Sequence, residues 1–186
     1  MVAGADTFRA MALFGDKDEK PILAVDIDGV ISLFGFEKPK SPAELGPDEV
    51  PGEYHLIDGM LHCISMPTGP RLNRLAESYQ LVWASGWEDR ANDHLPNILG
   101  LPELPYLTFE GRAVFGTAHW KLEALEEYAG GRPLAWIDDS LDGSCYEWAE
   151  KRPAPTLLVP TDSAHGLEAA HVEALESWAQ SGFTPG

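Results

Sequence analysis

Short apolar runs alternate with amphipathic stretches along most of the chain. The run at residues 22–25 is continuously apolar and rich in branched side chains, which indicates a strand buried on both faces. Four similar runs predict further strands, at residues 80–84, 105–109, 134–137 and 156–159. Apolar residues at helical spacing predict helices at residues 68–79, 88–99, 119–128, 144–151 and 167–180. This alternation predicts an α/β fold: a doubly wound, Rossmann-like sheet of five parallel strands with helices on both faces.

A β-hairpin is predicted between the first strand and the first of these helices. Two apolar runs, at residues 53–57 and 60–66, are joined by Asp58-Gly59, and Asp-Gly favours the positive φ angles of a two-residue hairpin turn. Residues 31–52, which precede the hairpin, are rich in Pro and Gly and predict an excursion away from the sheet. We therefore expect a small flap, inserted at about residues 33–67, over a site that stays open to solvent.

Composition limits the size of the protein and its partners. The chain has 186 residues, 44% of them hydrophobic, so we expect a single domain over residues 1–186. It carries 30 Asp and Glu against 13 Lys and Arg, a formal net charge of −17. Such a surface repels phosphate backbones and disfavours extended nucleic-acid binding. It still permits a single phosphate group held locally by a metal and one lysine.

The sequence also bears on where the protein works. No apolar stretch approaches the length needed to span a bilayer, and residues 1–20 lack the basic start and apolar core of a signal peptide. Residues 7–13 fit either a short helix or a loose arm. Cys63 and Cys145 lie far apart without metal-ligand spacing; free thiols in a cytoplasmic protein are the simplest interpretation, and one disulfide is the alternative. We expect a cytoplasmic protein with no membrane partner.

Two carboxylates follow the first predicted strand. Asp26 and Asp28 lie at its C-terminal end, the edge of an open α/β sheet at which ligands bind. With a period of two, both side chains point to the same side while the strand geometry lasts. Carboxylates so close repel each other unless a cation or a shared proton lies between them, and Mg²⁺ is the natural cation for an all-oxygen site. An ordinary acidic turn after a strand is the alternative.

Three further segments place polar residues where such a site would need them. Ser85-Gly86 follows the second strand, and a hydroxyl with nearby backbone N–H groups suits phosphoryl oxygens; otherwise Ser85 caps the next helix. Lys121 lies early in a helix, where a cation is locally unfavourable, so it either neutralises phosphate charge or is a solvated surface lysine. Asp138-Asp139 end another buried strand, with Asp142 close behind. A helix N-cap would explain one of these acids and not the cluster.

Taken in order, these motifs resemble those of the haloacid-dehalogenase-like (HAD) phosphohydrolases. The first motif stands here as Val25-Asp26-Ile27-Asp28-Gly29-Val30, and the likeness covers about residues 21–160. The resemblance implies a HAD-type fold with a small cap, with Asp26 as nucleophile and Asp28 as general acid and base. It implies that phosphate is bound by Ser85, Gly86 and Lys121. It implies that Mg²⁺ is held among Asp26, Asp28, Asp138 and Asp139, with the order of the last two open.

The expected activity is therefore hydrolysis of a small phosphomonoester by a Mg²⁺-dependent phosphatase. Residues 82–87 with Arg90 resemble a branch of the family that includes domains attached to RNA-repair proteins, which adds a nucleotide or nucleic-acid end as a substrate. One alternative is a non-catalytic member that binds or regulates. Another is a nucleotide-binding domain, although the first strand lacks a following Gly-x-Gly-x-x-Gly turn. Trp87 and Arg90 are candidate substrate contacts, whereas His94 and His119 lack zinc-ligand spacing and are interpreted as structural or surface residues.

Overall fold

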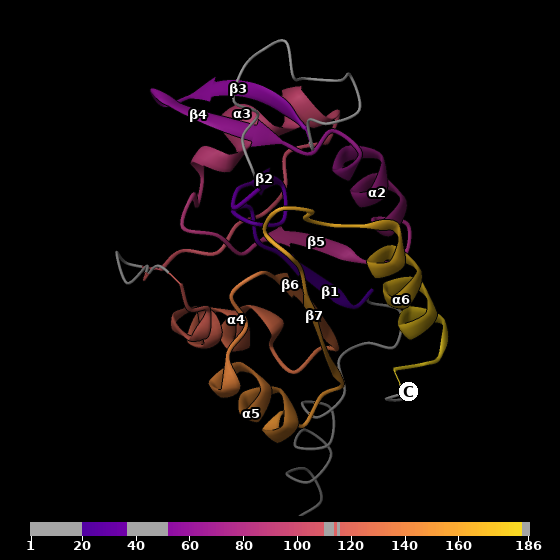
Figure 1. Ribbon diagram of the computed structural model, residues 1–186. Coiled ribbons are helices and arrows are strands. Elements are labelled where there is room, and N and C mark those ends of the chain that lie inside the picture. Colours follow the sequence, from indigo (N-terminus) through magenta and orange to yellow (C-terminus); the bar gives the residue numbers. More distant parts are fainter. Residues whose placement is uncertain (1–19, 37–51, 110–113, 115, 184–186) are drawn as a thin grey trace, which may run out of the picture.

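The computed structural model describes residues 20–36, 52–109, 114 and 116–183 of the chain (Figure 1). The predicted helix or arm at residues 7–13 lies outside these ranges, as does most of the Pro- and Gly-rich excursion at residues 31–52. Within the described ranges, no helix combines the length and apolar composition that crossing a membrane requires. Both cysteines are buried free thiols, so the disulfide alternative is not realised.

A four-stranded parallel sheet forms the centre of the protein. The strands lie in the order β5-β1-β6-β7. Their bounds are β1 (Ile22–Val25), β5 (Gln80–Trp83), β6 (Leu134–Asp138) and β7 (Thr156–Pro160). In the register, Val25 pairs with Trp83 on one side and with Ile137 on the other. Because these strands end level with one another, the residues that follow them meet at one edge of the sheet.

The prediction of a fifth strand at residues 105–109 is wrong. In this segment only Tyr106 forms an isolated bridge, with Trp83. Two backbone hydrogen bonds join the segment to β5, from Trp83 N–H to the Pro105 carbonyl and from Leu107 N–H to the Trp83 carbonyl. The backbone just before it pairs instead with the Asn92 side chain, which donates to the Leu104 carbonyl and accepts from the Leu104 N–H. A side-chain amide therefore takes the bonds that a longer ladder would use.

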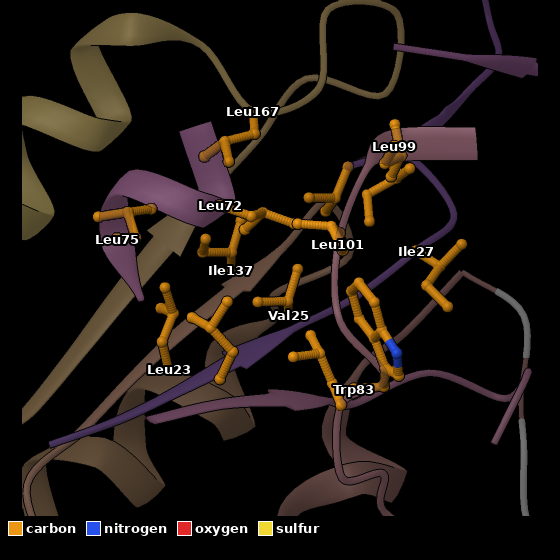
Figure 2. Packing of buried hydrophobic residues seen from close by; sticks show 14 of the residues in the cluster. Leu23, Val25, Ile27, Leu72, Leu75, Trp83, Leu99, Leu101, Ile137 and Leu167 are labelled. Carbon is orange, nitrogen blue, oxygen red and sulfur yellow. The ribbon is translucent and has the colours of Figure 1, made fainter. Parts of the chain in front are cut away.

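Helices cover both faces of the sheet, as predicted (Figure 1). One face packs against α2 (Thr68–Leu75), α3 (Arg90–Leu99) and α6 (Ala169–Gln180). The other face packs against α4 (Leu122–Ala129) and α5 (Gly143–Lys151). Figure 2 shows part of the first core, where Leu23 and Val25 of β1 lie among side chains of the helices and neighbouring strands. Residues 22 and 24 point into the second core, so β1 is buried on both sides.

Helix boundaries differ from the prediction by a few residues. The first helix ends at Leu75 instead of residue 79. The next begins at Arg90 instead of residue 88, because Glu88 has a positive φ of 50° and its carboxylate accepts a hydrogen bond from the Phe109 N–H. A 3-10 turn, η2 (His119–Lys121), precedes α4.

The predicted hairpin is confirmed. It consists of β3 (Glu53–Ile57) and β4 (Met60–Ile64), and the unpredicted strand β2 (Ser32–Leu33) adds to it in the order β2-β4-β3. The turn residues Asp58 and Gly59 have φ angles of 50° and 80°, the positive values that this turn needs. Figure 1 places this smaller antiparallel sheet beyond one end of the central sheet.

Candidate functional site

Asp26 and Lys121 form a buried ion pair at the edge of the central sheet. Asp26 directly follows β1, and its N–H donates to the Ile137 carbonyl at 3.0 Å, which extends the pairing with β6. Lys121 Nζ lies 2.9 Å from Asp26 Oδ1 and 2.7 Å from Asp138 Oδ2. The side chain of this lysine is only 4% exposed, so the surface-lysine alternative is excluded. A single ammonium group thus joins the ends of β1 and β6.

Asp138 and Asp139, which follow one another at the end of β6, differ in surroundings. Asp138 is fully buried, and its second oxygen accepts a hydrogen bond from the Ser140 N–H at 2.9 Å. Asp139 is partly exposed and its Oδ1 accepts from the Ser140 hydroxyl at 2.9 Å. Lys121 and Ser140 therefore engage both oxygens of Asp138, whereas Asp139 is the more accessible of the two acids.

Gly29 allows the first loop to approach Asp139. A Cβ atom at this position would lie 2.2 Å from Asp139 Oδ2, and the backbone has a φ of 74°. Both facts require glycine, because a side chain would clash with the carboxylate and would strain the backbone. The Gly29 carbonyl also accepts a hydrogen bond from the Thr161 hydroxyl at 3.1 Å, which ties this loop to the end of β7.

Asp26, Asp138 and Asp139 are close enough to share a cation. One carboxylate oxygen from each lies within 4.8 Å of the others. Three ionised carboxylates and the single ammonium of Lys121 leave two net negative charges, which one divalent cation would balance. An all-carboxylate donor set suits a hard cation such as Mg²⁺. The residues present thus fit a divalent metal, whereas the Asp28 carboxylate is not one of the three.

Burial shifts the protonation equilibria of the site. Desolvation raises the pKa of Asp26 to about 7, against the opposing effect of Lys121, and the nearby Asp138 adds to the rise. Burial also raises the pKa of Asp139. For Lys121, burial alone would lower the pKa, but the charges of Asp26 and Asp138 outweigh it and keep the pKa above its usual value. In the absence of a cation the cluster therefore retains a proton more readily than exposed carboxylates do.

Asp28 has a different set of contacts. Its Oδ2 accepts a hydrogen bond from Trp87 Nε1 at 3.0 Å. Burial raises the pKa of Asp28, while the hydrogen bond from Trp87 and the nearby His62 act in the opposite direction. Asp28 thus lies beside the carboxylate cluster with its own donor, so the two acids of the first motif have separate environments.

Ser85 and Gly86 lie at the end of β5, facing the same site. Ser85 is 1% exposed, and both residues line the cavity described below. The alternative that Ser85 caps a helix is not realised, because α3 begins at Arg90 and its N-terminus has no side-chain cap. Asp142, by contrast, is the N-cap of α5: its Oδ1 accepts from the N–H groups of Ser144 and Cys145. It does not belong to the carboxylate cluster.

An open cavity of about 830 Å³ lies above these residues. Its floor includes Asp26, Asp28, Ser85, Lys121 and Asp139. The hairpin, the loop before α3 and the segment before α4 form its walls. The wall residues include Ile57, Met60, His62, Trp87, Arg90 and Trp120. The volume lies in the range of pockets that bury small molecules.

The remaining candidates, Arg90, His94 and His119, lie at the rim of the cavity or on the surface. His94 Nε2 is 3.3 Å from Asp58 Oδ1, and Arg90 Nη1 is 3.4 Å from Asp58 Oδ2, so α3 contacts the tip of the hairpin. His119 is half-exposed and contacts Asp142. Neither histidine joins the carboxylate cluster, in agreement with their interpretation as structural or surface residues.

Sequence reasoning did not single out His62, which lies near Asp28. The sequence signal that could have identified it is the alternation of side chains along the strand: Met60 and His62, two residues apart, face the same side and both line the cavity. A prediction would also have required the register of the hairpin against the loop after β1.

No model of a known protein family matches the chain, and no curated protein matches it. The functional assignment therefore depends on the sequence motifs and on the geometry of the cavity.

Proposed function

We propose that this protein is a Mg²⁺-dependent phosphatase that hydrolyses a small phosphomonoester through an aspartyl-phosphate on Asp26. One observation carries the proposal: Asp26 lies on the floor of an open cavity, paired with the buried Lys121 and within reach of two further carboxylates. An ordinary acidic turn would not require a buried lysine that pairs with carboxylates at the ends of two strands. A site that forms an aspartyl-phosphate needs both a carboxylate nucleophile and fixed positive charge beside it.

The family resemblance supports the same proposal. The strand ends that carry Asp26, Ser85 and Asp138 are neighbours in the sheet order β5-β1-β6. We infer a HAD-type doubly wound fold in which the hairpin is a small cap. The central sheet has four described strands and not the predicted five; the segment predicted as the fifth lies beside β5, at the edge of the sheet, and leaves the order β5-β1-β6 unchanged.

In the first chemical step, a carboxylate oxygen of Asp26 attacks phosphorus and the bond to the leaving oxygen breaks. Lys121 keeps positive charge beside Asp26, which favours the ionised nucleophile. The Ser85 hydroxyl and nearby backbone N–H groups donate to the phosphoryl oxygens. Asp28 gives a proton to the leaving oxygen, so the alcohol departs neutral.

In the second step, Asp28 takes a proton from a water molecule that attacks phosphorus. The bond between phosphorus and Asp26 breaks, which releases inorganic phosphate and restores the carboxylate. Asp26, Asp138 and Asp139 would hold Mg²⁺, which when bound supplies positive charge that offsets the repulsion between the carboxylate and the phosphate oxygens. Of the two acids at the end of β6, Asp139 would contact the ion, whereas Asp138 would act on it through its charge while holding Lys121, because Lys121 and Ser140 engage both oxygens of Asp138.

The substrate is a small phosphorylated molecule, and a nucleotide or a nucleic-acid end also fits the cavity by size. The net charge of −17 opposes a long polyanion, while Lys121 and Arg90 offer local positive charge at the cavity. The buried free thiols fit a cytoplasmic protein.

The test is Mg²⁺-dependent phosphate release from small phosphomonoesters, nucleotides and oligonucleotides with 3′- or 5′-phosphates. Asp26→Asn should abolish release, whereas Glu147→Gln, at an exposed carboxylate of α5 outside the cavity lining, is the control and should retain it. Equal release by wild type and Asp26→Asn would exclude the nucleophile. Silence of a folded, Mg²⁺-binding wild type across all substrates would favour a non-catalytic binding or regulatory domain.

A further inference from the structure

Trp87 contacts the proposed general acid and base directly. It follows Ser85 and Gly86 in the loop after β5, and its Nε1 lies 3.0 Å from Asp28 Oδ2. An indole N–H can donate a hydrogen bond but cannot accept one. Asp28 Oδ2 must therefore act as the acceptor in this bond, whether or not the carboxyl group carries a proton.

His62, on the hairpin, packs against the indole ring of Trp87. Its ring meets the Trp87 ring edge to face, with centroids 4.8 Å apart and an interplanar angle of 69°. His62 Nδ1 is hydrogen-bonded to the Ser32 hydroxyl at 2.8 Å. The hydrogen bond to Asp28 and the ring contact with His62 together hold the Trp87 side chain in place.

Ser32 closes the network on the loop that bears Asp28. Its carbonyl accepts from the Gly29 N–H at 2.8 Å, and its own N–H donates to the Ile27 carbonyl at 2.9 Å. Trp87 and His62 are therefore anchored to the same loop from two sides. Because Trp87 and His62 both line the cavity, this closed ring of contacts lies at the candidate site and not in the hydrophobic core.

We propose that Trp87 is a positioning residue that holds Asp28 for proton transfer, with His62 as its brace. The proposal rests on the proposed function. A carbonyl oxygen accepts hydrogen bonds more strongly than a hydroxyl oxygen, so the indole donor at Oδ2 favours the protonated form of Asp28 that carries its proton on Oδ1. In the first step the Oδ1–H bond breaks and the proton goes to the leaving oxygen, which keeps the electron pair of the broken phosphorus–oxygen bond. In the second step Oδ1 takes up a proton from the attacking water.

This role has a consequence that a purely structural role would not have. An alkyl alkoxide is a poor leaving group and depends on the proton from Asp28, whereas 4-nitrophenolate departs without one. Loss of the Trp87 donor should therefore harm alkyl esters selectively. General acid catalysis contributes about 10²–10⁴-fold, and mispositioning the acid should remove roughly tenfold of this.

The experiment compares kcat/KM for glycerol phosphate and for 4-nitrophenyl phosphate in wild type and Trp87→Phe. The variant keeps a ring but removes the N–H donor. We expect the ratio of kcat/KM for glycerol phosphate to kcat/KM for 4-nitrophenyl phosphate to fall about tenfold in the variant. Trp178→Phe is the matched control, because Trp178 lies in the core on α6, stacked on Tyr79 and outside the cavity lining, and it should leave the ratio unchanged. His62→Ala should shift the ratio in the same direction by a smaller factor.

A double-mutant cycle with Asp28→Asn completes the test. If Trp87 acts through Asp28, adding Trp87→Phe to Asp28→Asn should change the residual rate by less than about twofold. Equal losses on both esters, or fully additive losses with Asp28→Asn, would overturn the positioning role and leave the proposed function intact. A wild type that hydrolyses neither ester, nor any other phosphomonoester, would overturn the proposed function and this inference together.

Discussion

The floor of the cavity and its hairpin wall are held by different forces. On the floor, Asp26, Lys121 and Asp138 are each less than 10% exposed and are joined by contacts shorter than 3.0 Å. On the hairpin, Met60 is 64% exposed, and the tip meets α3 through the exposed pair Asp58 and Arg90 at 3.4 Å. A rigid floor suits one fixed chemistry, because preorganised charges cost nothing to arrange at each turnover. A loosely held wall suits contact with the variable part of a substrate.

Removing the charge of Lys121 should produce the largest effect. Lys121→Met leaves two buried carboxylates without their partner, which should lower the free energy of unfolding by about 3–5 kcal/mol. Urea denaturation measures this loss. Lys151→Met is the matched control, since Lys151 forms an exposed pair with Glu147 and should cost less than about 1 kcal/mol. Similar losses for the two lysines would contradict the distinction between floor and surface.

Gly29→Ala should come next. The new Cβ would clash with Asp139, and the alanine would have to keep an unfavourable positive φ. We therefore expect the free energy of unfolding to fall by about 1–3 kcal/mol and Mg²⁺ binding to weaken. Gly130→Ala is the control: it has a φ of 55° but nothing within 4 Å, so it should show only the backbone cost. Calorimetric titration with Mg²⁺ separates the two, and an unchanged affinity in Gly29→Ala would argue against Asp139 as a ligand.

The raised pKa of Asp26 gives a pH effect of intermediate size. The folded, metal-free protein holds a proton up to about pH 7, well above the ordinary carboxyl value of 3.8, so it binds more protons than the unfolded chain between these values. The free energy of unfolding contributed by this group should therefore fall as the pH rises from about 4 to about 7. The stabilisation by Mg²⁺ should grow over the same interval, because the metal binds the ionised form.

Urea titrations in EDTA and in Mg²⁺, at a series of pH values, test this dependence. Asp26→Asn should remove the Asp26 part of the slope in EDTA. A slope that persists unchanged in Asp26→Asn would assign the effect to other groups.

The smallest effect should arise at the hairpin. Arg90→Gln breaks an exposed ion pair, so the free energy of unfolding should change by less than about 1 kcal/mol. If the wall contacts substrate, Arg90→Gln should change KM by a factor that differs from one phosphomonoester to another, and it should leave kcat largely unchanged. Steady-state kinetics on several esters checks this, and a uniform loss of kcat would place Arg90 with the floor instead.

The sequence predicted the floor better than the walls. Buried strands that end in acids identify Asp26 and Asp138 because strand period and sheet edge are local rules. The same rules failed at residues 105–109, because side chains of another segment take backbone hydrogen bonds at both ends: Asn92 pairs with Leu104, just before the segment, and Glu88 accepts from the Phe109 N–H. They could not find the partnership of Trp87, Asp28 and His62, which depends on how the loops after β1 and β5 meet the hairpin.

The most direct test of the central claim is mass spectrometry of protein quenched in acid during turnover with Mg²⁺. We expect a phosphorylated peptide that contains Asp26 and is absent from Asp26→Asn. With 4-nitrophenyl phosphate, whose leaving group needs no proton, it should accumulate in Asp28→Asn, where hydrolysis of the intermediate slows. Turnover by wild type without any phosphate on Asp26, or undiminished turnover by Asp26→Asn, would contradict the central claim.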